Sequence, residues 1–269
     1  IQDGPALPDD DSAAAEIFEA ILETVEERRQ AESQPVSHLR LEPRWERLPE
    51  FVRGCRVVPE PRDRYTEPRN TLCVDLRLSE ADLLAQMKPK GRYNIRVAQR
   101  SGVSVVEDSS ERGVADFLRL YKRTTDRHRI GAKPPSYFKA LVSILTSVRH
   151  GSIYFAEYQG LRLAGAVVVF FGNRATYFFG GSLIRHRRVM APYLLHFEIM
   201  RRAQAKGYDW YDLWGVAPEN QPNHPWQNIS VFKRKFGGIE VNLVPTLDYV
   251  FDHKAYERYL CAVGALQRA

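Results

Sequence analysis

The chain has 269 residues, of which 44% are hydrophobic and 27% charged, and its formal net charge is +6. These proportions exclude a disordered chain, a collagen-like repeat and a disulfide-stapled miniprotein. No run of about 18 apolar residues occurs, so the sequence predicts no transmembrane helix. Because the chain begins with Ile1 rather than Met, we expect a fragment or a processed product.

The spacing of apolar residues predicts an amphipathic helix over 13–31, and short strands at 38–42 and 57–58. Alternating apolar residues predict a strand over 71–78. Ser79 with Asp82 three positions later then predicts a helix start. From residue 103 on, strands are expected at 103–106, 153–158, 164–171, 175–179, 208–213, 239–243 and 248–251. Helices are expected at 110–128, 136–148, 192–206, 229–235 and 256–266.

This order of elements predicts an α+β fold with a mixed sheet rather than a doubly wound parallel sheet. It resembles the layout of the acyl-CoA N-acetyltransferase (GNAT) fold. We expect one near-complete GNAT-like domain over residues 87–269. Residues 1–86 are expected to form the C-terminal part of a second, truncated GNAT-like domain, because they lack enough strands for a full core.

Positive charge is concentrated in several short segments. Residues 1–32 carry a net charge of −8 and the rest of the chain +14, which indicates a polyanionic partner or simple solubility. If residues 88–100 are helical, Arg92 and Arg96 share a face and either contact phosphate or nucleic acid or lie in a solvated linker. Arg187 and Arg188 precede a helix start, a generic anion site, although this turn lacks the glycines that cradle coenzyme A.

The chemistry-bearing residues of the C-terminal third point to electrostatic catalysis. Asp212 at a strand end either orients a substrate amine or caps the next turn. Lys233 lies beside the apolar pair Phe232 and Phe236, where an ammonium is partly desolvated and close to a developing negative charge. His224 lacks partners at metal-ligand spacing, and the motifs of covalent nucleophiles are missing, so neither a metal site nor a covalent intermediate is expected.

Several motifs occur in a fixed order along residues 70–250. Together they resemble the Fem-type (FemABX) nonribosomal peptidyl transferases. The motifs are Arg92-Tyr93-Asn94-Ile95-Arg96, Thr125-x-Arg127, Tyr177-x-x-Gly180-Gly181-Ser182, Tyr211-Asp212-x-x-Gly215 and Phe232-Lys233-x-x-Phe236-Gly237-Gly238.

This resemblance implies an enzyme that moves an amino acid from aminoacyl-tRNA to an amine on the stem peptide of a lipid-linked or UDP-linked peptidoglycan precursor. Apart from the aminoacyl-tRNA co-substrate, no cofactor is implied. The expected place is the cytoplasm, with peripheral contact at the inner face of the membrane. The sequence leaves open which amino acid is added, how many, and the oligomeric state.

The resemblance also implies roles for individual residues. Lys233 is expected to face the carbonyl oxygen or the tRNA 3′ end, with Phe232 shaping the pocket. Thr125 and Arg127 match positions that hold the precursor diphosphate. The positions of Tyr177 and Phe179 match those lining the stem peptide. Three further roles are expected: Glu42 is a candidate general base or an ion-pair partner of a neighbouring arginine, Arg92 and Arg96 contact tRNA or hold the domains together, and Arg187 and Arg188 contact phosphate.

Two other readings remain open at this point. The first is an acyl-CoA-dependent N-acyltransferase on the same fold, which the missing glycine-rich loop disfavours. The second is a noncatalytic module that binds RNA or a cell-wall precursor, for which replacement of Lys233 would leave ligand binding intact.

Overall fold

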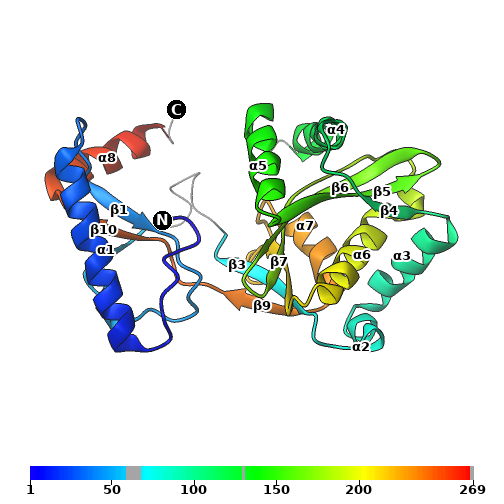
Figure 1. The fold of residues 1–269 in the computed structure, drawn as a ribbon, viewed down its shortest axis with the longest axis horizontal. Helices are drawn as coiled ribbons and strands as arrows, with labels where there is room; N and C mark the ends of the chain where they lie inside the picture. The colour runs from blue at the N-terminus through cyan, green and yellow to red at the C-terminus, as the bar shows by residue number, and fades with distance from the viewer. Residues whose placement is uncertain (59–67, 129–130, 267–269) are drawn as a thin grey trace. The chain divides into compact units, whose positions relative to one another are not determined.

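The computed structural model describes residues 1–58, 68–128 and 131–266. The chain divides into two compact units (Figure 1). Unit 1 combines Ile1–Asn70 with Val241–Ala269, and unit 2 is Thr71–Glu240. This division differs from the sequence-based boundary between residues 86 and 87, because strands from distant parts of the chain pair with one another.

Unit 1 is built around a three-stranded antiparallel sheet, in which β10 (Leu247–Val250) lies between β1 (His38–Leu41) and β2 (Arg56–Val57). The buried carboxylate of Asp248 on β10 accepts two hydrogen bonds of 2.8 Å from Arg40 on β1. This sheet therefore joins both ends of the chain in one core. Its helices are α1 (Asp11–Ala31), the short 3-10 helix η1 (Glu50–Val52) and α8 (His253–Leu266).

Unit 2 contains a mixed sheet with the strand order β4-β5-β6-β7-β8-β3-β9. Strands β4 to β7 are antiparallel neighbours, β7 and β8 run parallel, and β3 pairs antiparallel with β8. The prediction of a mixed sheet is thus confirmed. The strands are β3 (Asn70–Asp75), β4 (Ser104–Glu107), β5 (Gly151–Tyr158), β6 (Leu161–Phe171), β7 (Arg174–Ser182), β8 (Trp210–Gly215) and β9 (Ile239–Asn242).

Helices cover both faces of this sheet (Figure 1). Two helices pack on one face, around Phe117, Phe138 and Phe155, and are α4 (Glu111–His128) and α5 (Pro135–Ser147). The other face carries α2 (Glu80–Ala85), α3 (Pro89–Arg100) and α6 (Ala191–Ala205). As predicted, Ser79 caps α2 by accepting the Asp82 N–H at 3.2 Å.

Three short helical segments complete unit 2. They are η2 (Arg187–Val189) before α6, and α7 (Gln227–Lys233) with η3 (Arg234–Phe236) after β8. Gly91 of α3 lets this helix approach η3 closely, because a Cβ atom at Gly91 would lie 2.3 Å from the Lys235 carbonyl oxygen. Across the described residues, we find no helix with the length and apolar character needed to cross a membrane.

Candidate active site

The centre of the candidate site is the buried side chain of Lys233, the last residue of α7. It is only 6% exposed, and its Nζ donates a hydrogen bond of 2.7 Å to the carbonyl oxygen of Gly215, where β8 ends. Burial lowers the pKa of Lys233 to about 7, although the negative charge of Asp212 acts in the opposite direction. Near neutral pH the site therefore holds an amine that is partly protonated and shielded from water.

Aromatic side chains surround this lysine. The ring of Tyr177 on β7 has its centroid 5.8 Å from Lys233 Nζ. His196 on α6 lies edge-on to Tyr177, with ring centroids 4.5 Å apart, and also packs against Phe232 at 5.5 Å. The structure thus brings Lys233, Phe232 and Tyr177 together around the same histidine. Sequence reasoning missed His196, whose signal is a histidine within the apolar face of a helix.

Asp212 on β8 is fully buried and serves the local structure of the site. Its carboxylate accepts the Trp214 N–H at 2.8 Å and an Arg174 N–H at 3.1 Å, and also the hydroxyl of Thr71. Trp214 has a positive φ of 64° within β8, where the pairing with β3 is irregular, so the carboxylate stabilises a strained strand residue just before Gly215. The carboxylate thus holds three neighbouring strands together at the end of β8, a structural role rather than the cap of a following turn.

A second group of polar side chains lies at the C-terminal end of α4. Arg127 Nη1 donates to the Ser182 carbonyl oxygen at 3.1 Å, and the guanidinium stays exposed. Thr125 is buried and its hydroxyl donates to Lys122 of its own helix. The neighbouring Thr124, which sequence reasoning missed, is the residue whose hydroxyl contacts Ser182, accepting its N–H at 2.8 Å.

Tyr177 and Phe179 lie on opposite faces of the sheet. Two residues apart on a regular strand they would share a face, but the β6–β7 register shifts at Phe178. Tyr177 therefore packs with the core around α6. Phe179 packs with α4 and α5, with its ring centroid 5.9 Å from that of Tyr121 and 4.9 Å from that of Phe138. The structure therefore does not bring the two rings together on one face of the sheet, and their roles at a peptide site stay predictions.

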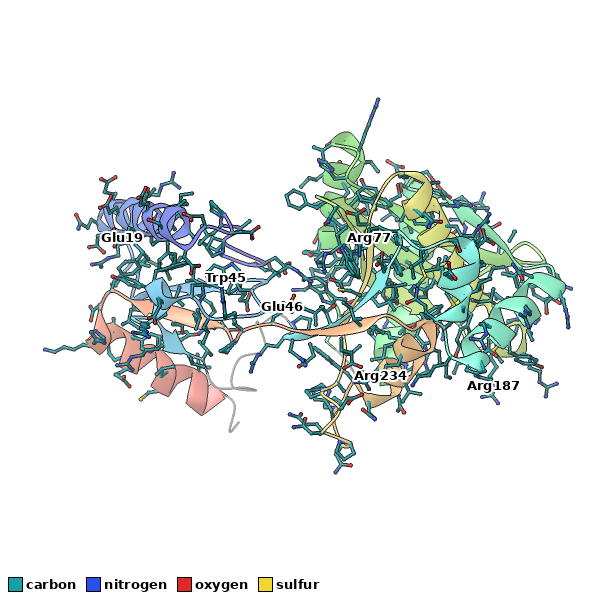
Figure 2. All side chains as sticks on the ribbon, turned by 90° about the horizontal axis from the view of Figure 1, so that it is seen from below. Glu19, Trp45, Glu46, Arg77, Arg187 and Arg234 are labelled. Carbon is teal, nitrogen blue, oxygen red and sulfur yellow. The ribbon has the colours of Figure 1, made fainter. Side chains whose placement is uncertain are left out.

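Four arginines were predicted to contact tRNA or phosphate. One of them has a structural role, and the other three are exposed. Arg92 Nη1 donates to the carbonyl oxygens of Ala85 and Met87. It therefore holds the α2–α3 connection rather than sharing an open face with Arg96. Arg96 is exposed, as are Arg187 and Arg188 on η2, which packs against α3. Figure 2 shows Arg187 at the rim of unit 2.

Glu42 belongs to unit 1, where its main-chain N–H donates to the Ile1 carbonyl oxygen at 3.0 Å. Its role as a general base stays a prediction. Within residues 1–58, 68–128 and 131–266, no three His, Cys, Asp or Glu side chains are grouped as metal ligands.

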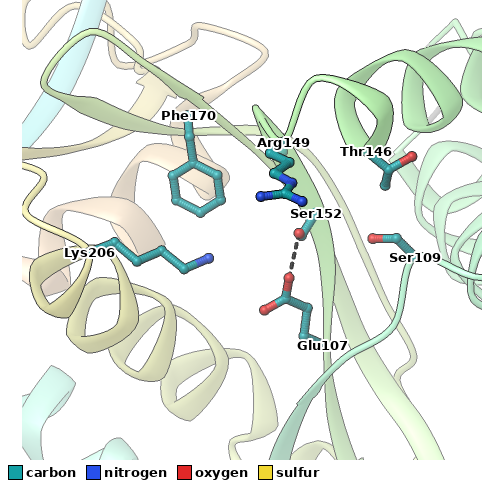
Figure 3. Close-up of a pocket in the computed structure, with 8 residues that line it drawn as sticks. Glu107, Ser109, Thr146, Arg149, Ser152, Phe170 and Lys206 are labelled. Carbon is teal, nitrogen blue, oxygen red and sulfur yellow. Dashed lines mark hydrogen bonds between the residues drawn. The ribbon is translucent and has the colours of Figure 1, made fainter.

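A pocket of about 510 Å³ opens elsewhere on unit 2, next to the start of β5 (Figure 3). Arg149 and Lys206 extend toward it, and Glu107 accepts a hydrogen bond from Ser152 at its wall. None of the residues that line it is a predicted site residue, so the pocket is distinct from the Lys233 site. Its lining is Glu107, Ser109, Thr146, Arg149, Gly151, Ser152, Phe170 and Lys206.

Comparison with known proteins assigns the chain to a family of known sequences. Residues 60–157 and 151–263 match the FemAB family, and the chain belongs to that family. A UDP-N-acetylmuramoylpentapeptide-lysine N(6)-alanyltransferase of Weissella viridescens is 25% identical over 193 residues, covering 71% of this chain and 56% of the relative. A lipid II:glycine glycyltransferase of Staphylococcus epidermidis is 20% identical over 253 residues, covering 71% of this chain and 61% of the relative. The chain thus spans less than two thirds of the length of these curated relatives.

Solved structures agree on the fold. The crystal structure of FemX superposes with a TM-score of 0.83 at 17% identity, covering 93% of this chain and 80% of that one. The C-terminal domain of a putative lysylphosphatidylglycerol synthetase from Agrobacterium fabrum gives a TM-score of 0.57 at 16% identity, covering 96% and 78%. The expected α+β fold class with a mixed sheet is thereby confirmed, and the chain shares the fold of FemX.

Proposed function

We propose that this chain is an aminoacyltransferase that moves an amino acid from aminoacyl-tRNA to an amine on the stem peptide of a peptidoglycan precursor. The observation that carries this proposal is the buried Lys233, whose ammonium is fixed by Gly215 beside Tyr177. Two relatives support the acceptor class, because their names specify a UDP-linked muramoyl pentapeptide and lipid II.

The reaction is the aminolysis of an ester. The neutral acceptor amine attacks the carbonyl carbon of the aminoacyl ester, and the carbonyl oxygen becomes negatively charged in the tetrahedral intermediate. When that intermediate collapses, the C–O bond to the tRNA breaks, an amide forms, and the proton lost by the amine goes to the leaving ribose hydroxyl. No covalent enzyme intermediate and no cofactor are needed.

Lys233 is the group that we assign to the developing oxyanion. A preorganised cation at low dielectric stabilises such a charge far more than the same cation does in water. The carbonyl of Gly215 holds the ammonium at one side, and Phe232 closes the apolar wall. The burial that weakens protonation of Lys233 also strengthens its interaction with an anion.

We assign the precursor diphosphate to the end of α4. The exposed guanidinium of Arg127 is anchored by Ser182 and offers a planar fork suited to phosphate oxygens. Thr124 fixes the same loop through Ser182, so it replaces Thr125 as the hydroxyl at this position. We assign tRNA to the exposed cations Arg96, Arg187 and Arg188 on the α3 side of unit 2.

The test combines the chain with pools of charged tRNA and with either a UDP-linked pentapeptide or lipid II in detergent, followed by mass spectrometry of the precursor. We expect a mass increase of one or more amino acids. K233M should reduce the rate by about two to three orders of magnitude, as for the loss of one oxyanion-hole donor. Because the donor is a cytoplasmic RNA, we place the reaction on the cytoplasmic side of the membrane.

Three outcomes would contradict the proposal. One is the lack of any mass increase with every pool and precursor, and another is K233M turnover equal to that of the unmodified chain. The third is transfer from acetyl-CoA instead of aminoacyl-tRNA, which would support the acyl-CoA-dependent alternative. A binding module without activity would retain RNA binding in K233M and show no turnover in either form.

A further inference from the structure

The ring of Tyr177 leans toward the C-terminal end of its own strand and covers Gly180. A Cβ atom placed on Gly180 would lie 1.8 Å from the Tyr177 hydroxyl oxygen and 2.5 Å from Cζ. The φ angle of Gly180 lies outside the left-handed region, so its backbone conformation does not require glycine. Glycine is needed at this position because the tyrosine ring occupies the space of a side chain.

His196 holds the same ring from the side of α6. The two rings meet at an angle of 89°, the edge-to-face arrangement that aromatic pairs favour. The Nδ1 atom of His196 shares a hydrogen bond of 2.8 Å with the Tyr211 hydroxyl on β8. Burial, and secondarily the charge of Lys233, lower the pKa of His196 to about 3, so the imidazole stays neutral. His196 is thus an uncharged side chain that is held by Tyr211 and packs against the ring of Tyr177.

The ring of Tyr177, which Gly180 and His196 hold in place, lies next to Lys233. The ammonium contacts the Gly215 carbonyl at 2.7 Å and has the Tyr177 ring centroid at 5.8 Å. The ring excludes water from the lysine, and its π-electrons attract a cation. A displaced ring would leave the ammonium hydrated and free to point elsewhere.

We infer that Gly180 and His196 are positioning residues, which clamp the ring of Tyr177 against Lys233 and thereby fix the direction of the ammonium. Neither residue touches the reacting atoms in this scheme. The inference rests on the proposed function, and it explains why a small residue and a buried imidazole occur at these two places. Such fixed geometry matters because a displacement of about 1 Å in a catalytic group can reduce turnover about 100-fold.

The first experiment is a double-mutant cycle with G180A and Y177A in the full chain. G180A is expected to lower kcat by about tenfold or more while KM changes little, and to have no further effect in the Y177A background. G131A is the matched control, because a Cβ atom at Gly131 meets nothing within 4 Å. Equal losses from G180A in both backgrounds would overturn the inference.

The second experiment tests His196 with H196A and H196F. H196A should lower kcat only when Tyr177 is present, and H196F should restore most of that loss because it keeps a ring against Tyr177. If circular dichroism shows that H196A does not fold, the role of His196 is tested by comparing H196F with the unmodified chain. If H196F folds but its kcat is as low as that of Y177A, the role of His196 is its hydrogen bond to Tyr211 and not its ring contact with Tyr177. That result would overturn the part of the inference that concerns His196.

The third experiment does not depend on turnover. Selective ¹³C labelling of lysine allows the pKa of Lys233 to be measured by NMR in the unmodified chain, G180A, G131A and Y177A. We expect a pKa near 7 in the unmodified chain and in G131A, and higher values in G180A and Y177A, whose ammonium is hydrated. If these shifts appear without turnover, the clamp stands and the proposed function fails. An unchanged pKa in G180A overturns the clamp.

Discussion

The ammonium of Lys233 donates a hydrogen bond of 2.7 Å to the main-chain oxygen of Gly215, 18 residues earlier in the chain. This bond ties α7 to the end of β8 and satisfies one N–H of a lysine that is 6% exposed. A carbonyl oxygen accepts a hydrogen bond from the Lys233 amine whether or not the amine is protonated, so this contact does not by itself keep Lys233 charged. The ionisation of Lys233 therefore makes both stability and activity depend on pH.

The first prediction concerns the stability of K233M. Between about pH 7 and the ordinary lysine pKa of 10.5 the folded chain binds fewer protons than the unfolded chain, so the stability of the unmodified chain rises with pH. Below about pH 7, each unit by which folding lowers the pKa of Lys233 destabilises the folded chain by about 1.4 kcal/mol. K233M removes this cost, but it also loses the hydrogen bond to Gly215, which offsets about 1–3 kcal/mol of the gain in stability.

K233M should therefore be more stable than the unmodified chain by about 2 kcal/mol at pH 6, and this advantage should disappear by pH 10. Urea unfolding at pH 6, 8 and 10 measures the difference. K235M is the control, because Lys235 is only two positions away in the sequence and is less buried. An advantage of K233M that does not change with pH would contradict the prediction.

The second prediction concerns the pH dependence of transfer. If the acceptor amine on the stem peptide has the ordinary alkylamine pKa of about 10.4, it must lose its proton to react, whereas Lys233 must be charged. The logarithm of kcat/KM for the precursor should rise with a slope of about 1 up to pH 7 and then level off as Lys233 loses its proton. A continued rise between pH 7 and 9 would show that the charge on Lys233 is not required.

The third prediction concerns Arg127, whose guanidinium is anchored by Ser182. R127A should raise KM for the precursor about 10- to 100-fold with kcat nearly unchanged, as expected for a lost hydrogen bond to a charged group. R127K should restore little, because an ammonium cannot form the bidentate contact. R123A, an exposed arginine on the same helix, is the control. Steady-state kinetics at saturating aminoacyl-tRNA separates the two constants.

The fourth prediction concerns the exposed cations beside α3. Binding to tRNA should weaken as salt rises, and R187A/R188A should reduce the slope of log K against log salt by about 0.7–0.9 for each contact removed. R112A should leave the slope unchanged, because Arg112 is on α4, which packs on the opposite face of the sheet. Fluorescence anisotropy with labelled tRNA measures these slopes, and equal slopes for all three proteins would exclude this surface.

Local sequence patterns predicted most of the elements, because helical and strand periodicity depend on which residues become buried. The helix expected over 110–128 is observed as α4, Glu111–His128, and Ser79 caps α2 as predicted. Periodicity failed where the backbone departs from it. The irregularity at Phe178 separates Tyr177 from Phe179 across the sheet, and no residue type at that position marks it.

The site was predictable as a set of motifs but not as a geometry. The Phe-Lys motif indicated Lys233, but its bond to Gly215 and its contact with Tyr177 depend on long-range packing. The division of the chain into two units also depends on long-range packing. Arg40 and Asp248 meet across a separation of 208 positions, which strand patterns alone do not reveal. Long-range pairing of this kind explains why the observed division differs from the boundary expected near residue 86.

The placement of β10 between β1 and β2 has a consequence for how the chain is made. A ribosome releases β1 and β2 long before β10, so the sheet of unit 1 has no central strand while Thr71–Glu240 is being synthesised. All the strands from β4 to β8, with β3, are by then available to pair with one another. Synthesis thus favours a vectorial order of folding, in which the inserted segment matures first and the flanking unit closes around its last strand.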